Sequence, residues 1–205
     1  WLAPFAAHKD SVLAREHPDW IVRDKGGEPL LAGSNWGGFW GLDIQRQDVQ
    51  DHLRKVFATI RDGWGFKVLK LDFLYAACMV PLHGRTRGEI MAFAMDFLRE
   101  IAGDASILAC GVPLASAFGR VEYCRIGCDV GLDWDGPWHH RFLHRERVST
   151  RQSLASTFGR RHLNGRVFLN EPDVWIGRNS SDVKLTKKQK EKLHHDNEAW
   201  GGLVF

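Results

Sequence analysis

The sequence of 205 residues has no long hydrophobic run. A membrane-spanning helix needs roughly 20 consecutive apolar residues, so no membrane partner is expected. Charge of one sign is also scarce, since the net charge is only +3. The one basic run, KLTKKQKEK near the end of the sequence, is typical of a solvated helix face. Nucleic acid is therefore not an expected partner.

Cysteine is scarce as well, and its spacing matches no common zinc pattern. The four cysteines are Cys78, Cys110, Cys124 and Cys128. A metal held by Cys124, Cys128 and a histidine such as His139 is an alternative. Buried free thiols are the better interpretation, because Cys124 lies in an apolar context. No glycine-rich phosphate turn follows any predicted strand, and we expect neither a metal nor a cofactor.

What the sequence does contain is a regular alternation of short apolar runs and helical patterns. The apolar runs predict strands at residues 1–5, 66–73, 106–110, 124–129, 166–170 and 202–205. The helical patterns predict helices that begin near residues 48, 86, 149 and 186, the second and fourth with capping boxes. Residues 6–48 look like an excursion that contains a hairpin, and residues 130–148 form another long connection.

This βα rhythm fits either an open α/β sheet or a (β/α)8 barrel. Polar residues that follow the predicted strands favour the barrel, because catalytic groups gather at the C-terminal ends of barrel strands. These residues are Asp72, Cys110, Asp129, Asn170, Glu171 and Asp173. Six strands are two short of closure, and both chain ends look like strands. We therefore expect an incomplete TIM barrel, a single partial catalytic domain over residues 1–205.

The stretch FKVLKLDFLY places two charges inside a predicted buried strand. Lys70 and Asp72 are two residues apart, so both point to the same face, with Asp72 nearest the C-terminal rim. Buried charges are costly unless they pair. A purely structural ion pair is one interpretation. A carboxylate kept charged by a neighbouring ammonium, as a nucleophile requires, is the other.

The stretch CRIGCDVGLDW supplies a second carboxylate at a strand end. Arg125 and Asp129 share strand parity, and Trp134 follows in the loop as a candidate substrate-binding residue. Asp129 is interpreted either as a turn-capping residue or as a general acid that faces Asp72. Two facing carboxylates are what glycoside hydrolysis requires, one as nucleophile and one as acid.

Further candidates lie at the other strand ends. Cys110 and Gly111 end one strand in ACGVPL, where Gly111 would allow close approach of substrate to the backbone. Three rim residues in LNEPDVW are interpreted as groups that bind sugar hydroxyls or cap their loop: Asn170, Glu171 and Asp173.

Six motifs in order resemble the α-galactosidases of glycoside hydrolase family 36, the melibiase group of clan D. They are WLAPF, EHPDW, LKLDF, CGVPL, RIGCDV and LNEPDVW, and they span nearly the whole chain. The resemblance implies a retaining (β/α)8 barrel that removes terminal α-D-galactosyl units from oligosaccharides such as melibiose and raffinose by double displacement. It implies that Asp72 is the nucleophile and Asp129 the acid/base. Trp1, Lys70 and Arg125 would line the galactose pocket.

The sequence also departs from the family pattern. Glu171 stands where the family usually has aspartate in N-D-P-D. The N-terminal β-domain, the first two barrel strands with their paired aspartate, and the C-terminal β-domain are absent. The isolated chain is therefore expected to be poorly stable, with exposed strand edges, and weakly active or inactive. The compartment stays open, with the cytoplasm favoured, as does homo-oligomerisation of a full-length protein.

Alternative functions differ in their chemistry. Within the same family, the alternatives are galactosyl transfer of the raffinose-synthase kind and hydrolysis of α-N-acetylgalactosaminides. A metal-dependent barrel of the enolase type would need about three carboxylates on one ion, and Asp72, Asp129 and Asp173 are the candidates. A non-catalytic sugar-binding remnant would bind an oligosaccharide without turnover.

Overall fold

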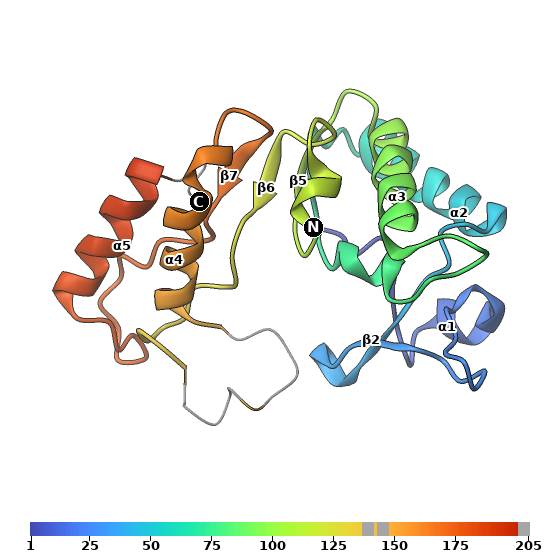
Figure 1. The fold of residues 1–205 in the computed structure, drawn as a ribbon, viewed down its shortest axis with the longest axis horizontal. Helices are drawn as coiled ribbons and strands as arrows, with labels where there is room; N and C mark the ends of the chain where they lie inside the picture. Colours follow the sequence, from blue (N-terminus) through green and yellow to red (C-terminus); the bar gives the residue numbers. More distant parts are fainter. Residues whose placement is uncertain (137–141, 143–147, 201–205) are drawn as a thin grey trace. The chain divides into compact units, whose positions relative to one another are not determined.

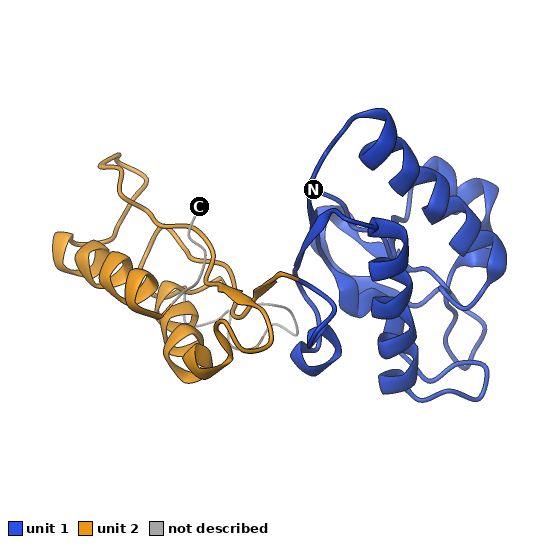
Figure 2. Cartoon of the chain, turned by 90° about the horizontal axis from the view of Figure 1, so that it is seen from above, with its two compact units in different colours: residues 1–121 blue, residues 122–205 orange. Residues whose placement is uncertain are grey.

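The computed structural model describes residues 1–136, 142 and 148–200. The chain divides into two compact units, residues 1–121 and 122–205, coloured separately in Figure 2. Each unit holds one pair of parallel strands, so the predicted α/β class with parallel strands is confirmed.

Unit 1 is built around strands β4 (Val68–Leu71) and β5 (Ser106–Ala109), which pair in parallel. The β4 side chains alternate between two environments. Leu69 and Leu71 are buried, whereas Val68 on the opposite face is exposed. This is the period-two pattern of a strand with one face packed against helices.

Two amphipathic helices, α2 (Gln47–Ala58) and α3 (Arg87–Ala102), lie side by side in unit 1 (Figure 1). The predicted capping box of α3 is present. The Thr86 side chain accepts from the Glu89 backbone N–H, while the Glu89 carboxylate accepts from the Thr86 backbone N–H. Gly103 ends the helix with φ 59°. The helices bury Val49, Leu53, Phe57, Ile90, Met91, Ala94 and Leu98.

The predicted hairpin in residues 6–48 is confirmed as a three-stranded antiparallel sheet. Its strands β1 (Ala6–His8), β2 (Leu31–Gly33) and β3 (Phe39–Gly41) are ordered β1-β3-β2. A short helix, α1 (Val12–Glu16), follows β1. Gly41 lets this sheet approach the segment after β4, because a Cβ there would lie 2.5 Å from the Ala76 carbonyl oxygen.

The strand predicted at residues 1–5 is wrong in its extent. Leu2 forms a single parallel bridge to Leu71 of β4, donating its N–H to the Lys70 carbonyl at 2.9 Å. Pairing stops there because Pro4 has no N–H to donate. The Ala6 N–H turns back to a carbonyl three residues earlier at 3.2 Å, and the chain then enters the antiparallel sheet.

Unit 2 contains strands β6 (Tyr123–Arg125) and β7 (Leu169–Glu171), which pair in parallel. Helices α4 (Thr150–Arg160) and α5 (Lys187–Trp200) lie side by side (Figure 1). Their apolar cluster consists of Val130, Leu154, Ile176, Leu185 and Leu193. The strand predicted at residues 202–205 lies outside the described residues.

The strand predicted at residues 124–129 is shorter than expected. β6 ends at Arg125, and the following segment packs against α4. Gly127 permits that approach, because a Cβ there would lie 3.1 Å from the Ser156 Cβ. Asp129 therefore lies beyond the strand, in irregular structure. Among the helices of the described residues, none is both long and apolar enough to cross a membrane.

Candidate active site

Asp72 lies directly after β4, and its carboxylate accepts two N–H groups. The indole Nε1 of Trp1 donates to Oδ2 at 3.2 Å, and the backbone N–H of Phe73 donates to Oδ1 at 2.7 Å. Trp1 reaches this position because the neighbouring Leu2 pairs with β4. The carboxylate is half-buried, so it is oriented by the fold yet accessible to a ligand.

Lys70 lies on the same face of β4 as Asp72 and is also half-buried. In the described part of the chain, the hydrogen bonds of Asp72 come from Trp1 and Phe73 and not from Lys70. The interpretation as a buried structural Lys–Asp pair therefore gains no support. The ammonium remains on the face of the strand that carries the candidate nucleophile.

Three aromatic rings, those of Trp1, Trp36 and Phe73, contact one another beside Asp72. Trp1 makes edge-to-face contacts with Trp36 at a centroid distance of 6.0 Å and with Phe73 at 6.3 Å. The Trp36 and Phe73 rings are themselves 5.3 Å apart. Trp36 comes from the loop between β2 and β3, 36 positions before Asp72 in the sequence. Sequence reasoning missed Trp36, because no motif connects that loop to the carboxylate.

Cys110 and Gly111 follow β5, and the structure brings both to the segment after β4. The Cys110 carbonyl accepts from the Leu74 N–H at 3.3 Å, and the Gly111 carbonyl accepts from the Tyr75 N–H at 2.8 Å. Gly111 has φ 58°, and a Cβ there would lie 3.3 Å from Phe73 backbone atoms. The glycine thus allows two backbones to approach each other next to Asp72. A contact of either residue with substrate stays a prediction.

In unit 2, a single arginine binds three carboxylates. Arg125 donates Nη1 to Asp129 at 2.7 Å, Nη2 to Asp173 at 2.7 Å and Nε to Glu171. The parallel pairing of β6 with β7 places Arg125 opposite Glu171. Charge-assisted bonds from the rigid guanidinium fix both the distance and the orientation of its partners.

The three carboxylates differ sharply in burial. The Glu171 side chain is 1% exposed and the Asp173 side chain 9%, whereas the Asp129 side chain is 57% exposed. Asp173 also accepts the Val130 N–H at 2.7 Å, and its own N–H donates to Glu171 at 2.8 Å. Glu171 and Asp173 are therefore committed to holding Arg125 and the loop, while Asp129 is open to a ligand.

Sequence reasoning placed Glu171 at the rim, but it did not assign the ion pair of Glu171 with Arg125. The sequence shows glutamate at this position in place of the expected aspartate. The structure explains why a longer side chain fits here. Its two oxygens bind separate partners, the Arg125 Nε and the Asp173 N–H. For Asp173, a contact with sugar hydroxyls stays a prediction, since its hydrogen bonds already go to the protein.

Trp134 is partly buried and packs against the apolar cluster of unit 2. Its backbone carbonyl accepts from the Arg151 N–H near the start of α4 at 3.0 Å. These contacts give Trp134 a packing role in this unit. A contact of Trp134 with substrate stays a prediction.

The cysteines are free thiols, as predicted, and three of them are buried. Burial, with a further contribution from the Glu171 charge, raises the pKa of the Cys124 thiol to about 12. Its Sγ donates to the Arg125 carbonyl at 3.6 Å, and the half-buried Cys128 donates to the Ser149 carbonyl at 3.5 Å. His139, the third member of the alternative metal set, lies outside the described residues.

Backbone strain gathers around both carboxylate groups. Among the described residues, four other than glycine have positive φ: Trp36, Phe73, His83 and Asp173. For residues with bulky side chains this conformation is costly, and it persists mainly where function or the surrounding structure demands it. In unit 1, Phe73 follows Asp72 and contacts Trp36. In unit 2, Asp173 binds Arg125.

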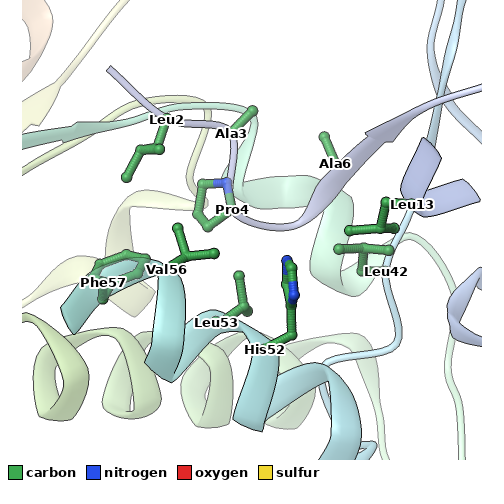
Figure 3. Close-up of a pocket in the computed structure, with 10 residues that line it drawn as sticks. All are labelled: Leu2, Ala3, Pro4, Ala6, Leu13, Leu42, His52, Leu53, Val56 and Phe57. Atoms are coloured by element: carbon green, nitrogen blue, oxygen red, sulfur yellow. The ribbon is translucent and has the colours of Figure 1, made fainter. Parts of the chain in front are cut away.

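An apolar hollow elsewhere in unit 1 is a poor alternative site. Figure 3 shows it between the segment after Trp1 and the face of α2. Its volume is about 140 Å³. Its only titratable lining residue is His52, whose pKa is lowered by burial and then by the charges of His17 and Lys55. The lining residues are Leu2, Ala3, Pro4, Ala6, Leu13, Leu42, His52, Leu53, Val56 and Phe57. Without a carboxylate, this hollow lacks the groups for glycoside chemistry.

The chain closely matches solved α-galactosidase structures. It is 31% identical to the α-galactosidase of Thermus thermophilus, solved in complex with p-nitrophenyl α-D-galactopyranoside, with a TM-score of 0.87 over 98% of this chain and 41% of that chain. The same enzyme in complex with stachyose gives 31% identity and a TM-score of 0.85 over 98% of this chain and 44% of that chain. The chain thus spans less than half the length of these structures.

A more distant α-galactosidase, from Lactobacillus brevis, is 15% identical, with a TM-score of 0.54 over 98% of this chain and 26% of that chain. At that identity the likeness shows the fold alone. No protein-family model matches the sequence. The structural neighbours therefore assign the chain the α/β architecture of glycosidase barrels, and α-galactosidases are among them.

Proposed function

We propose that this chain forms the catalytic core of a retaining α-galactosidase that removes terminal α-D-galactosyl units from oligosaccharides of the melibiose and raffinose type. The similarity over 98% of the chain to an α-galactosidase at 31% identity carries the proposal. The motifs that include Asp72 and Asp129 support the finer assignment to glycoside hydrolase family 36. A (β/α)8 barrel that contributes its third to eighth strands here is the corresponding architecture.

Asp72 is proposed as the nucleophile. Its carboxylate oxygen forms a bond to the anomeric carbon of the galactosyl unit while the bond from that carbon to the glycosidic oxygen breaks. The two N–H donors from Trp1 and Phe73 suit this role, because an ionised carboxylate accepts such bonds. Lys70 on the same strand face adds positive charge beside the developing site.

Asp129 is proposed as the acid/base. It passes a proton to the leaving oxygen in the first step and takes one from water in the second, when water attacks the anomeric carbon and Asp72 is released. Arg125 binds its Oδ1, which leaves Oδ2 as the oxygen for proton transfer. A retaining mechanism requires the Asp72 and Asp129 carboxyl groups to be roughly 5–5.5 Å apart in the assembled site.

The test is chemical rescue in the complete polypeptide that carries this sequence. Asp72→Gly should abolish hydrolysis of p-nitrophenyl α-galactoside, and azide should restore turnover. Azide then attacks the anomeric carbon from the vacated side, p-nitrophenolate leaves, and the product is β-galactosyl azide. Asp104→Gly, at an exposed carboxylate that forms a loose ion pair with Lys67 at 3.8 Å, should keep wild-type activity. Failure of azide to restore turnover in a folded variant would remove Asp72 from its role.

Assays with the same protein distinguish the proposed hydrolase from the alternative functions. Excess sucrose as acceptor distinguishes galactosyl transfer from hydrolysis by its trisaccharide product. Activity that survives a chelator argues against the enolase-type alternative, which needs a metal held by carboxylates. A wild-type protein that binds oligosaccharide and never turns it over would instead be the non-catalytic remnant.

A further inference from the structure

We propose that Trp36 is a specificity-determining residue that packs against the leaving-group sugar of the substrate. This inference rests on the proposed α-galactosidase function. The inference depends on the position of the exposed Trp36 indole. This indole has a strained backbone conformation, and one aromatic ring separates it from the candidate nucleophile.

The position of Trp36 follows from a chain of contacts within unit 1. Asp72 accepts the Trp1 indole N–H, and Trp36 contacts Trp1 at a centroid distance of 6.0 Å. Trp36 also contacts Phe73, the residue that follows Asp72. Trp1 is thus the aromatic neighbour of the carboxylate, and Trp36 lies one ring farther out. A galactosyl unit positioned for attack by Asp72 would contact Trp1, and the leaving-group sugar still attached to that unit would be in reach of Trp36.

Trp36 offers a large free face despite these contacts. Its exposure is 65% and that of Trp1 is 63%, so the two indoles form a continuous exposed aromatic surface. Both contacts of Trp36 to its neighbours are edge-to-face, with interplanar angles of 83° and 80°. Edge contacts use the rim of one ring in each pair, so much of the indole stays available for a flat apolar sugar face.

The conformation of Trp36 is held by its surroundings. Its φ of 52° and ψ of 29° are left-handed values, which a bulky residue rarely adopts. The Trp36 carbonyl is 2.9 Å from His8 Nε2, and the Gly38 N–H donates to the Asn35 carbonyl at 2.9 Å. Because these hydrogen bonds fix the loop, the Trp36 ring loses little conformational entropy when a sugar binds. An aromatic contact therefore contributes more of its energy to the affinity.

The experiment compares two substrates that share the galactosyl unit and differ in the leaving group. In the complete polypeptide, Trp36→Ala should lower kcat/KM for raffinose on the order of tenfold, mainly through KM, as expected for the loss of one aromatic contact. For p-nitrophenyl α-galactoside, kcat/KM should change less than about threefold, because that leaving group has no sugar ring. Trp36→Phe should recover most of the raffinose activity.

Trp64→Ala is the matched control. Trp64 is 68% exposed and contacts Phe66, before β4 begins and away from Asp72. This variant should leave both substrates unchanged. The circular dichroism spectrum and the melting temperature of each variant establish that it folds.

Two outcomes overturn the inference. Equal losses on both substrates would mean that Trp36 only supports Trp1 and Asp72. No loss on either would mean that the exposed indole has no part in binding. Failure of the proposed function itself gives a different result, since the wild-type protein would then hydrolyse neither substrate.

Discussion

Trp1 donates its indole N–H to the carboxylate of Asp72 across 3.2 Å, although 71 positions separate the two residues in the sequence. The bond exists because Leu2 pairs with the strand that ends just before Asp72. The candidate nucleophile is therefore oriented by a residue that the motif around it does not contain.

Trp1→Phe separates the hydrogen bond from the ring. The variant keeps an aromatic surface and loses the N–H donor to Asp72. Because one neutral donor to a charged acceptor is worth roughly 1.5–3 kcal/mol, kcat/KM for p-nitrophenyl α-galactoside should fall about tenfold to hundredfold, with little change in melting temperature, since Trp1 is largely exposed. Steady-state kinetics and a thermal melt measure both quantities, and unchanged kinetics would contradict the orienting role.

The effect of Asp129→Asn should depend on how strongly the leaving group needs a proton, if Asp129 is the acid/base. Loss of general acid catalysis typically costs 10²–10⁴-fold, so kcat/KM for raffinose should fall by about that factor. The p-nitrophenolate leaving group needs little protonation, and kcat/KM for its galactoside should fall much less. The side chain is 57% exposed, so the free energy of unfolding should barely change. Equal losses for the two substrates would remove Asp129 from the acid role.

Arg125→Met should destabilise the protein strongly. The substitution leaves Glu171 and Asp173 buried without their shared cation, and breaking a buried pair from one side costs roughly 3–5 kcal/mol. Urea unfolding measures this loss in the free energy of unfolding. The control is Arg178→Met, because Arg178 pairs with Asp182 at the surface and an exposed pair is worth less than about 1 kcal/mol. Similar losses for the two variants would contradict a buried network.

Because the Cys124 thiol is buried, we expect the free energy of unfolding to decrease at alkaline pH. Its pKa is raised in the folded state from the ordinary 9.0 to about 12, first by burial and then by the Glu171 charge. In the unfolded chain the thiol ionises near 9, so the folded state keeps full stability below pH 9. Stability then falls as the pH rises from about 9 towards 12, by at most about 1.4 kcal/mol per pH unit.

Urea midpoints between pH 8 and pH 11 test this for the wild-type protein and for Cys124→Ala. Cys124→Ala is less stable than the wild-type protein at pH 8 because packing is lost. Its free energy of unfolding should nevertheless decrease less steeply with pH than that of the wild-type protein. Parallel declines in the two proteins would show that other groups cause the alkaline loss.

The sequence alone determined the elements whose signals are local. The capping box at Thr86 and Glu89 predicted the start of α3, since its two hydrogen bonds join residues three positions apart. The two-residue spacing of Lys70 and Asp72 predicted that both lie on one face of the strand, because successive strand side chains point to opposite sides. Asp72 and Asp129 were found for the same reason, as polar residues that follow short apolar runs.

Tertiary structure decided which distant residues meet. Trp36 reaches the Asp72 neighbourhood through a loop of an antiparallel sheet, and Glu171 reaches Arg125 through the pairing of β6 with β7. Neither contact leaves a periodic signal, because loop conformation and strand register depend on interactions across the whole unit. The sequence by itself thus supplied the candidate reacting groups. The tertiary structure determined which aromatic, cationic and anionic side chains contact these groups and orient them.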